Sequence, residues 1–155
     1  MTIEPIRKSV CVACPPARAF TLFTARMGRW WPARMTIAAA PFAEIVIEPR
    51  VGGLWFERSA DGVESQWGHV MEWEPPDRVL LAWQIGEGFR FDPGLVTELE
   101  MRFEAEGEGC RVSLEHRHLE RLGAVAESLA KLLAGGWPTI VGAYGAFADA
   151  AGVEV

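Results

Sequence analysis

Apolar and polar residues alternate in short runs between residues 42 and 118, and turn residues separate the runs. The clearest run is VTELEMRFEAE, which predicts a strand with one apolar face and one charged face. The residues predicted to share the apolar face are Thr97, Leu99, Met101, Phe103 and Ala105. Because the whole region holds six such runs, it predicts six short strands in an antiparallel meander.

Helical patterns flank this region on both sides. Residues 5–13 predict one further strand, PPARAFTLFT predicts a helix that starts at its prolines, and MGRWWP predicts a second short helix or turn. In residues 119–152 apolar residues recur at helical spacing, although GGWP interrupts them. Because Pro138 removes a helical hydrogen bond, we expect one long kinked helix, or two helices placed end to end.

The order of these elements predicts one α+β domain that covers residues 1–155. A sheet with one charged face must bury its other face, and the C-terminal helix is the element available to cover it. On the strand that ends in EHRH, the same alternation turns Val112, Leu114 and His116 inward. We therefore expect a curved seven-stranded antiparallel sheet around a long helix, with space for a site between them.

One strand does not follow this simple alternation. In SQWGHVMEWE the residues Trp67, His69, Met71 and Trp73 share one face, while Val70 lies on the other. Both faces are therefore partly apolar, and alternation alone leaves open which of them points inward. An apolar face left outside would favour a dimer surface.

Charge and composition exclude several classes of function. The 155 residues carry a net charge of −6, and the absence of a basic cluster argues against a nucleic-acid partner. The N-terminus lacks the apolar core of a secretory signal, and no apolar run is long enough to span a bilayer, so we expect a cytoplasmic protein without a membrane partner. Cys11 and Cys14 form a CxxC, but on a strand they lie on opposite sides, roughly 10 Å apart, which disfavours a disulfide or zinc site.

Five segments in this order resemble one known family. They are PPARAFTLFT with GRWWP, GGLWFE, WGHVMEWEPPDRVLLAW, GCRVSLEH and GGWPTI. Together they resemble the START-like (SRPBCC) superfamily, which includes the birch-pollen allergens, and within it the family named after the activator of heat-shock protein 90 ATPase. The resemblance implies the helix-grip fold and a cavity between sheet and helix. The eukaryotic activator carries a further domain ahead of this one, which counts against a chaperone-stimulating role.

The aromatic residues are the candidate site. Each of them taken alone favours core packing, but as a group in this fold they predict an apolar cavity for a small apolar or aromatic molecule. The predicted ligand-binding residues are Trp30, Trp31, Trp83, Phe89, Phe91, His116 and Trp137. Two alternatives remain: an interaction module that forms a homodimer or contacts a chaperone, and a cyclase or hydrolase that uses His116 as acid or base. No sequence motif indicates a catalytic residue, a cofactor or a metal.

The adjacent tryptophans of MGRWWP raise a separate question. Neighbouring side chains point in different directions, so one of the pair is expected in the core and the other near the cavity. We predict that Trp31, fixed beside Pro32, is the more buried of the two.

Overall fold

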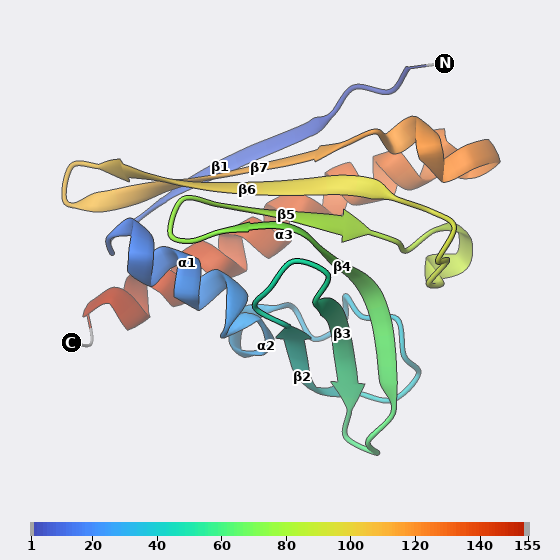
Figure 1. Cartoon of the computed structure of the whole chain (residues 1–155), viewed down its shortest axis with the longest axis horizontal. Coiled ribbons are helices and arrows are strands. Elements are labelled where there is room, and N and C mark those ends of the chain that lie inside the picture. The colour runs from blue at the N-terminus through green and yellow to red at the C-terminus, as the bar shows by residue number, and fades with distance from the viewer. Residues whose placement is uncertain (1, 154–155) are drawn as a thin grey trace.

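The computed structural model describes residues 2–153 and has the predicted α+β helix-grip architecture (Figure 1). Seven antiparallel strands form one curved sheet in the order β1-β7-β6-β5-β4-β3-β2. The strands are β1 (Ile6–Val12), β2 (Phe42–Ile47), β3 (Leu54–Ser59), β4 (Glu64–Glu74), β5 (Arg78–Trp83), β6 (Thr97–Glu106) and β7 (Gly109–Arg117). The helical elements are α1 (Pro16–Thr24), α2 (Met27–Trp30), η1 (Glu87–Phe89), η2 (Leu119–Val125) and α3 (Ala126–Val153).

The alternation in β6 and β7 selects the inner face of the sheet as predicted. Leu99 pairs with His116 and Met101 pairs with Leu114, and all four side chains are buried. Ala105, at the far end of the same face, is exposed because the β6–β7 hairpin extends beyond the core. The inward position of His116 therefore follows from strand register.

Strand β4 is where the predicted alternation fails. Its register shifts twice, once against β3 at Trp67 and once against β5 at Met71, so Trp67 and Val70 are both buried. Each bulge adds a residue and bends the strand, and Figure 1 shows β2, β3 and the start of β4 turned away from β5–β7. Gly68 is required between the bulges because a Cβ there would lie 1.7 Å from the carbonyl oxygen of Ala82.

The C-terminal helix is one continuous element that contains Pro138. It begins at Ala126, so the first part of the predicted apolar stripe falls in η2, where Gly123 has a φ of 82°. The Tyr144 hydroxyl donates a 2.8 Å hydrogen bond to the carbonyl oxygen of Ala19, which ties α3 to α1. No helix within residues 2–153 has the length and apolar character needed to cross a membrane.

The outer face of the sheet carries a dense ion-pair network. Glu100 is only 7% exposed and pairs with Arg78, Arg102 and Arg117. Burial opposes its ionisation, yet the hydrogen bond and charge of Arg78, with the charges of the other two arginines, hold the pKa of Glu100 below its ordinary value. The predicted charged face is therefore present, and its side chains pair across the strands, with Glu100 largely buried among its arginine partners.

Candidate functional site

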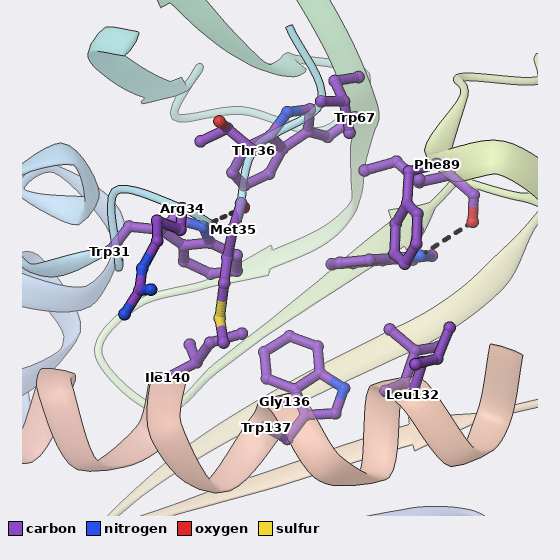
Figure 2. A pocket seen from close by; sticks show the side chains of 14 residues that line it. Trp31, Arg34, Met35, Thr36, Trp67, Phe89, Leu132, Gly136, Trp137 and Ile140 are labelled. Carbon is purple, nitrogen blue, oxygen red and sulfur yellow. Dashed lines mark hydrogen bonds between the residues drawn. The ribbon is translucent and has the colours of Figure 1, made fainter. Parts of the chain in front are cut away.

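A pocket of about 280 Å³ lies between α3, the segment that follows α2, and strands β4 and β5. Figure 2 shows Gly136, Trp137 and Ile140 of α3 on one side, with Met35, Thr36 and Trp67 opposite them. The lining residues are Trp31, Arg34, Met35, Thr36, Ile37, Trp67, Trp83, Ile85, Phe89, Leu132, Leu133, Gly136, Trp137 and Ile140. Apart from the tryptophans, only Arg34 and Thr36 contribute polar side chains to this lining.

Four tryptophans form the pocket wall, and protein acceptors take the indole N–H of each one. Trp31 donates to the Met35 carbonyl oxygen at 2.7 Å. Trp67 donates to Oε1 of Glu57 at 2.8 Å. The other two bonds run from Trp83 to the carbonyl oxygen of Ile85 at 3.1 Å and from Trp137 to Nδ1 of His116 at 3.2 Å. Since every indole donor is satisfied by protein, the pocket presents carbon surface to a ligand.

The two adjacent tryptophans divide into one core residue and one pocket residue as expected, but burial barely separates them: Trp31 is only marginally the more buried, and it is the one that lines the pocket. Their exposed fractions, 6% for Trp30 and 5% for Trp31, are nearly equal. Trp30 ends α2, packs against Phe23 and Tyr144 at centroid distances of 5.3 and 5.1 Å, and does not line the pocket. Trp31 has already left the helix, with an extended backbone, and its ring lies 4.9 Å from Trp67. The end of α2 between them therefore turns Trp31 toward the pocket.

His116 lies behind the pocket wall and outside the lining. It is 0% exposed, Nδ1 accepts from Trp137, and Nε2 lies 2.8 Å from Oγ1 of Thr97. Because an indole nitrogen can only donate, the proton of the neutral ring belongs on Nε2, and the Thr97 hydroxyl then donates to the carbonyl oxygen of Trp83. Burial lowers the pKa of His116 to about 3. His116 therefore holds two pocket tryptophans in place as a neutral, fully bonded ring.

The phenylalanines of the β5–β6 loop also separate. Phe89 lines the pocket mouth, is 47% exposed, and has a φ of 55°, which is uncommon for a residue other than glycine. Phe91 instead forms an isolated bridge with Ile85 and does not line the pocket. Of the seven predicted site residues, the pocket brings together Trp31, Trp83, Phe89 and Trp137.

Sequence reasoning missed two important parts of the site. Trp67 was noticed, but the bulges of β4 hid its direction. The segment of Met35, Thr36 and Ile37 has no helical or strand periodicity that would signal a pocket wall. Across residues 2–153, His, Cys, Asp and Glu do not gather in groups of three that could hold a metal ion.

Comparisons with known proteins agree with this architecture. The family model "Activator of Hsp90 ATPase homolog 1-like protein" matches residues 13–143. A search of curated sequences finds no match.

Several solved structures are similar over nearly the whole chain. A self-sacrificing resistance protein, CalC from Micromonospora echinospora, is 30% identical, with 98% of each chain covered and a TM-score of 0.73. An anthrahydroquino-gamma-pyrone synthase, Txn09, solved as a complex, is 35% identical over 93% of this chain and 96% of its own, with a TM-score of 0.65. The Aha1 dimer from Colwellia psychrerythraea shares the fold at 13% identity, covering 95% of this chain and 97% of its own, with a TM-score of 0.65.

The matched segment starts before α1 and ends within α3, so it includes every wall of the pocket. The chain belongs to the family of the activator of Hsp90 ATPase homolog 1-like proteins, within the START-like superfamily.

Proposed function

We propose that this protein binds a small, flat aromatic molecule in the pocket between the sheet and α3. The observation that carries the proposal is the wall of four tryptophans whose N–H groups all bond to protein. Such a wall offers ring faces and edges, which attract another aromatic ring beyond the gain from apolar burial. Because hydrogen bonds hold the walls before any ligand arrives, binding costs little side-chain ordering.

Size and relatives support the same class of ligand. The volume of about 280 Å³ lies near the lower end of the range for small-molecule sites, which favours a molecule of two or three fused rings. The synthase at 35% identity is named for an anthrahydroquinone-derived product, which is itself a fused-ring aromatic. The pocket mouth carries Phe89 and Leu132, which are 47% and 57% exposed and extend the apolar surface outward.

A catalytic role for His116 gains no support from its surroundings. Both ring nitrogens are engaged, the residue is fully buried, and its pKa of about 3 keeps it neutral near pH 7. A proton donor or acceptor must reach the reacting atom, and the Trp137 indole separates this ring from the pocket.

Two adjacent glycines of α3 provide the test. Gly136 lines the pocket, and a Cβ there would lie 4.0 Å from Cε of Met35, whereas a Cβ at Gly135 would meet nothing within 4 Å. Gly136→Leu is therefore expected to fill the pocket, while Gly135→Leu leaves it open. We expect Gly136→Leu to weaken naphthalene binding, measured by calorimetry, at least about tenfold. This corresponds to the loss of roughly one aromatic contact in the pocket.

The matched variant makes the result decisive. Both substitutions add the same side chain to the same helix, so a shared loss of binding would point to helix damage and not to the pocket. If naphthalene and its larger fused-ring analogues bind neither the unmodified protein nor Gly135→Leu, the proposed function is wrong.

A further inference from the structure

Three buried polar atoms lie on one face of β3 without a hydrogen-bond partner in residues 2–153. They are Nε1 of Trp55, Oε2 of Glu57 and Oγ of Ser59. The residues occupy alternate positions, so all three point to the same side of the sheet, and their exposed fractions are 0%, 0% and 2%. Buried polar atoms in native proteins are nearly always bonded, so three in one row mark a polar strip in the apolar interior.

Glu57 connects this strip to the pocket. Its Oε1 accepts hydrogen bonds from the backbone N–H of Ile37 at 2.7 Å and from the indole N–H of Trp67 at 2.8 Å. Ile37 and Trp67 both line the pocket, so the carboxyl group lies directly behind the pocket wall. Its other oxygen, Oε2, is the one without a partner.

The surroundings of Glu57 call for a further hydrogen-bond donor. Within the described residues no arginine, lysine or histidine forms an ion pair with it, in contrast to Glu100 on the outer face. A buried carboxylate oxygen without a donor is costly, and a hydrogen bond to a charged group contributes more than one between neutral groups. A donor that reaches Oε2 is therefore bound strongly, whereas an acceptor at the same place is repelled.

The wall in front of Glu57 is not held by sheet hydrogen bonds at Ile37. The segment between α2 and β2 has no regular secondary structure, and the Ile37 amide bonds to the Glu57 side chain and not to a strand. Moving Ile37 therefore breaks no sheet hydrogen bond. The carboxylate can take the hydroxyl of a ligand while it keeps the indole N–H of Trp67.

We propose that Glu57 is the specificity-determining acceptor of the pocket and selects aromatic ligands that carry a hydroxyl group, such as phenols and naphthols. This inference rests on the proposed function, since it names the polar group of a ligand whose rings occupy the tryptophan pocket. The ring system is held by carbon surface, and the hydroxyl donates to Oε2 of Glu57 between Ile37 and Trp67. An aromatic ether of the same shape has no proton to donate, so it is rejected.

Three ligands of nearly equal size test this inference by calorimetry: naphthalene, 2-naphthol and 2-methoxynaphthalene. In the unmodified protein we expect 2-naphthol to bind roughly tenfold or more tightly than 2-methoxynaphthalene, the usual effect of one hydrogen bond to a charged acceptor. In Glu57→Gln the amide oxygen takes the place of Oε1 and keeps the bond from Trp67, which leaves the NH2 group at the free position. That variant is expected to lose the preference or to reverse it, while naphthalene binds as before.

Ser59→Ala serves as the matched control, because it changes the same buried strip without touching the carboxylate. It should retain the 2-naphthol preference. If Glu57 had a purely structural role, Glu57→Gln would weaken the binding of all three ligands together. It would not replace a preference for the hydroxyl ligand, a donor, by a preference for the ether, an acceptor.

Each remaining outcome separates this inference from the proposed function. If the unmodified protein binds naphthalene but shows less than about a twofold preference between the two derivatives, Glu57 does not select hydroxyl groups and only the inference fails. The same conclusion follows if Glu57→Gln keeps the preference for 2-naphthol. If none of the three ligands binds, the proposed function fails and the inference fails with it.

Discussion

The space between the sheet and α3 has two ends, and side chains fill only one of them. At the packed end, Phe20, Phe23, Trp30, Phe103 and Tyr144 form a chain of aromatic contacts with centroid distances of 5.1 to 6.0 Å. The cavity left there is about 10 Å³. At the open end, four tryptophans surround about 280 Å³.

The difference lies in what holds the aromatic rings. At the packed end the rings contact one another, and three of them, Phe20, Phe23 and Trp30, are carried by α1 and α2. At the open end each tryptophan is fixed from behind by a hydrogen bond, and α3 offers Gly136 where a side chain would otherwise enter. Protein interiors are close-packed, so a cavity needs walls that resist collapse, and these hydrogen bonds restrict the movement of the four rings into the space.

The largest expected effect contrasts one phenylalanine from each end. Phe103→Ala removes a fully buried ring from the packed end and should lower the free energy of unfolding by about 3–5 kcal/mol. Phe89→Ala, at the exposed pocket mouth, should change it by no more than about 0.5 kcal/mol yet weaken naphthalene binding. Urea unfolding and calorimetry measure the two quantities. Equal losses of stability would abolish the distinction between the ends.

The next effect is a pH dependence that belongs to the open end. Burial lowers the pKa of His116 from 6.5 to about 3. Between these two pH values His116 is protonated in the unfolded chain but stays neutral in the folded protein. The stability from this group is complete above pH 6.5 and is lost as the pH falls toward 3. Between pH 6.5 and 4.5 the loss amounts to about 2.3 kcal/mol.

Urea unfolding across this pH window measures the slope. Glu100 and Glu115, whose pKa values lie below 4.5, lose their contribution only at lower pH, so the upper window reports on His116. His116→Gln should flatten the slope, whereas Phe103→Ala should keep it. An unchanged slope in His116→Gln would assign the pH dependence to another group.

The smallest effect sharpens the comparison within a single helix turn. Gly135→Ala and Gly136→Ala should each raise the free energy of unfolding by about 0.5–1 kcal/mol, because alanine favours the helix over glycine. Only Gly136→Ala places a methyl group against Met35 in the pocket, so it alone should weaken naphthalene binding. Thermal unfolding and calorimetry check both parts. A gain in stability without a change in affinity at Gly136 would show that the pocket is larger than its walls indicate.

Local patterns carried most of the fold prediction and part of the site prediction. The inward direction of Leu99, Met101 and His116 follows from simple alternation, because β6 and β7 pair without interruption. The same reasoning fails on β4, where the register shifts by one residue at Trp67 and again at Met71, so alternation could not predict the orientation of Trp67.

The candidate site depends on contacts between distant segments. Glu57 lies in the strand sequence LWFERS, between an aromatic residue and an arginine. Nothing in that local sequence indicates that its side chain accepts a hydrogen bond from the amide of Ile37, twenty residues earlier. His116 had the predicted direction, but its bonding to Trp137 and Thr97 makes it a support for the wall and not part of the lining.

The sequence by itself determined the order of elements, the inner face of the regular strands and the surplus of aromatic residues, because periodicity and turn chemistry are local properties. The tertiary structure alone decided which tryptophan of MGRWWP faces the pocket, which end of the interior stays open and where a buried carboxylate lacks a donor. Those features depend on where α2 ends, on the bulges of β4 and on the crossing of α3, which bring residues far apart in the chain into contact.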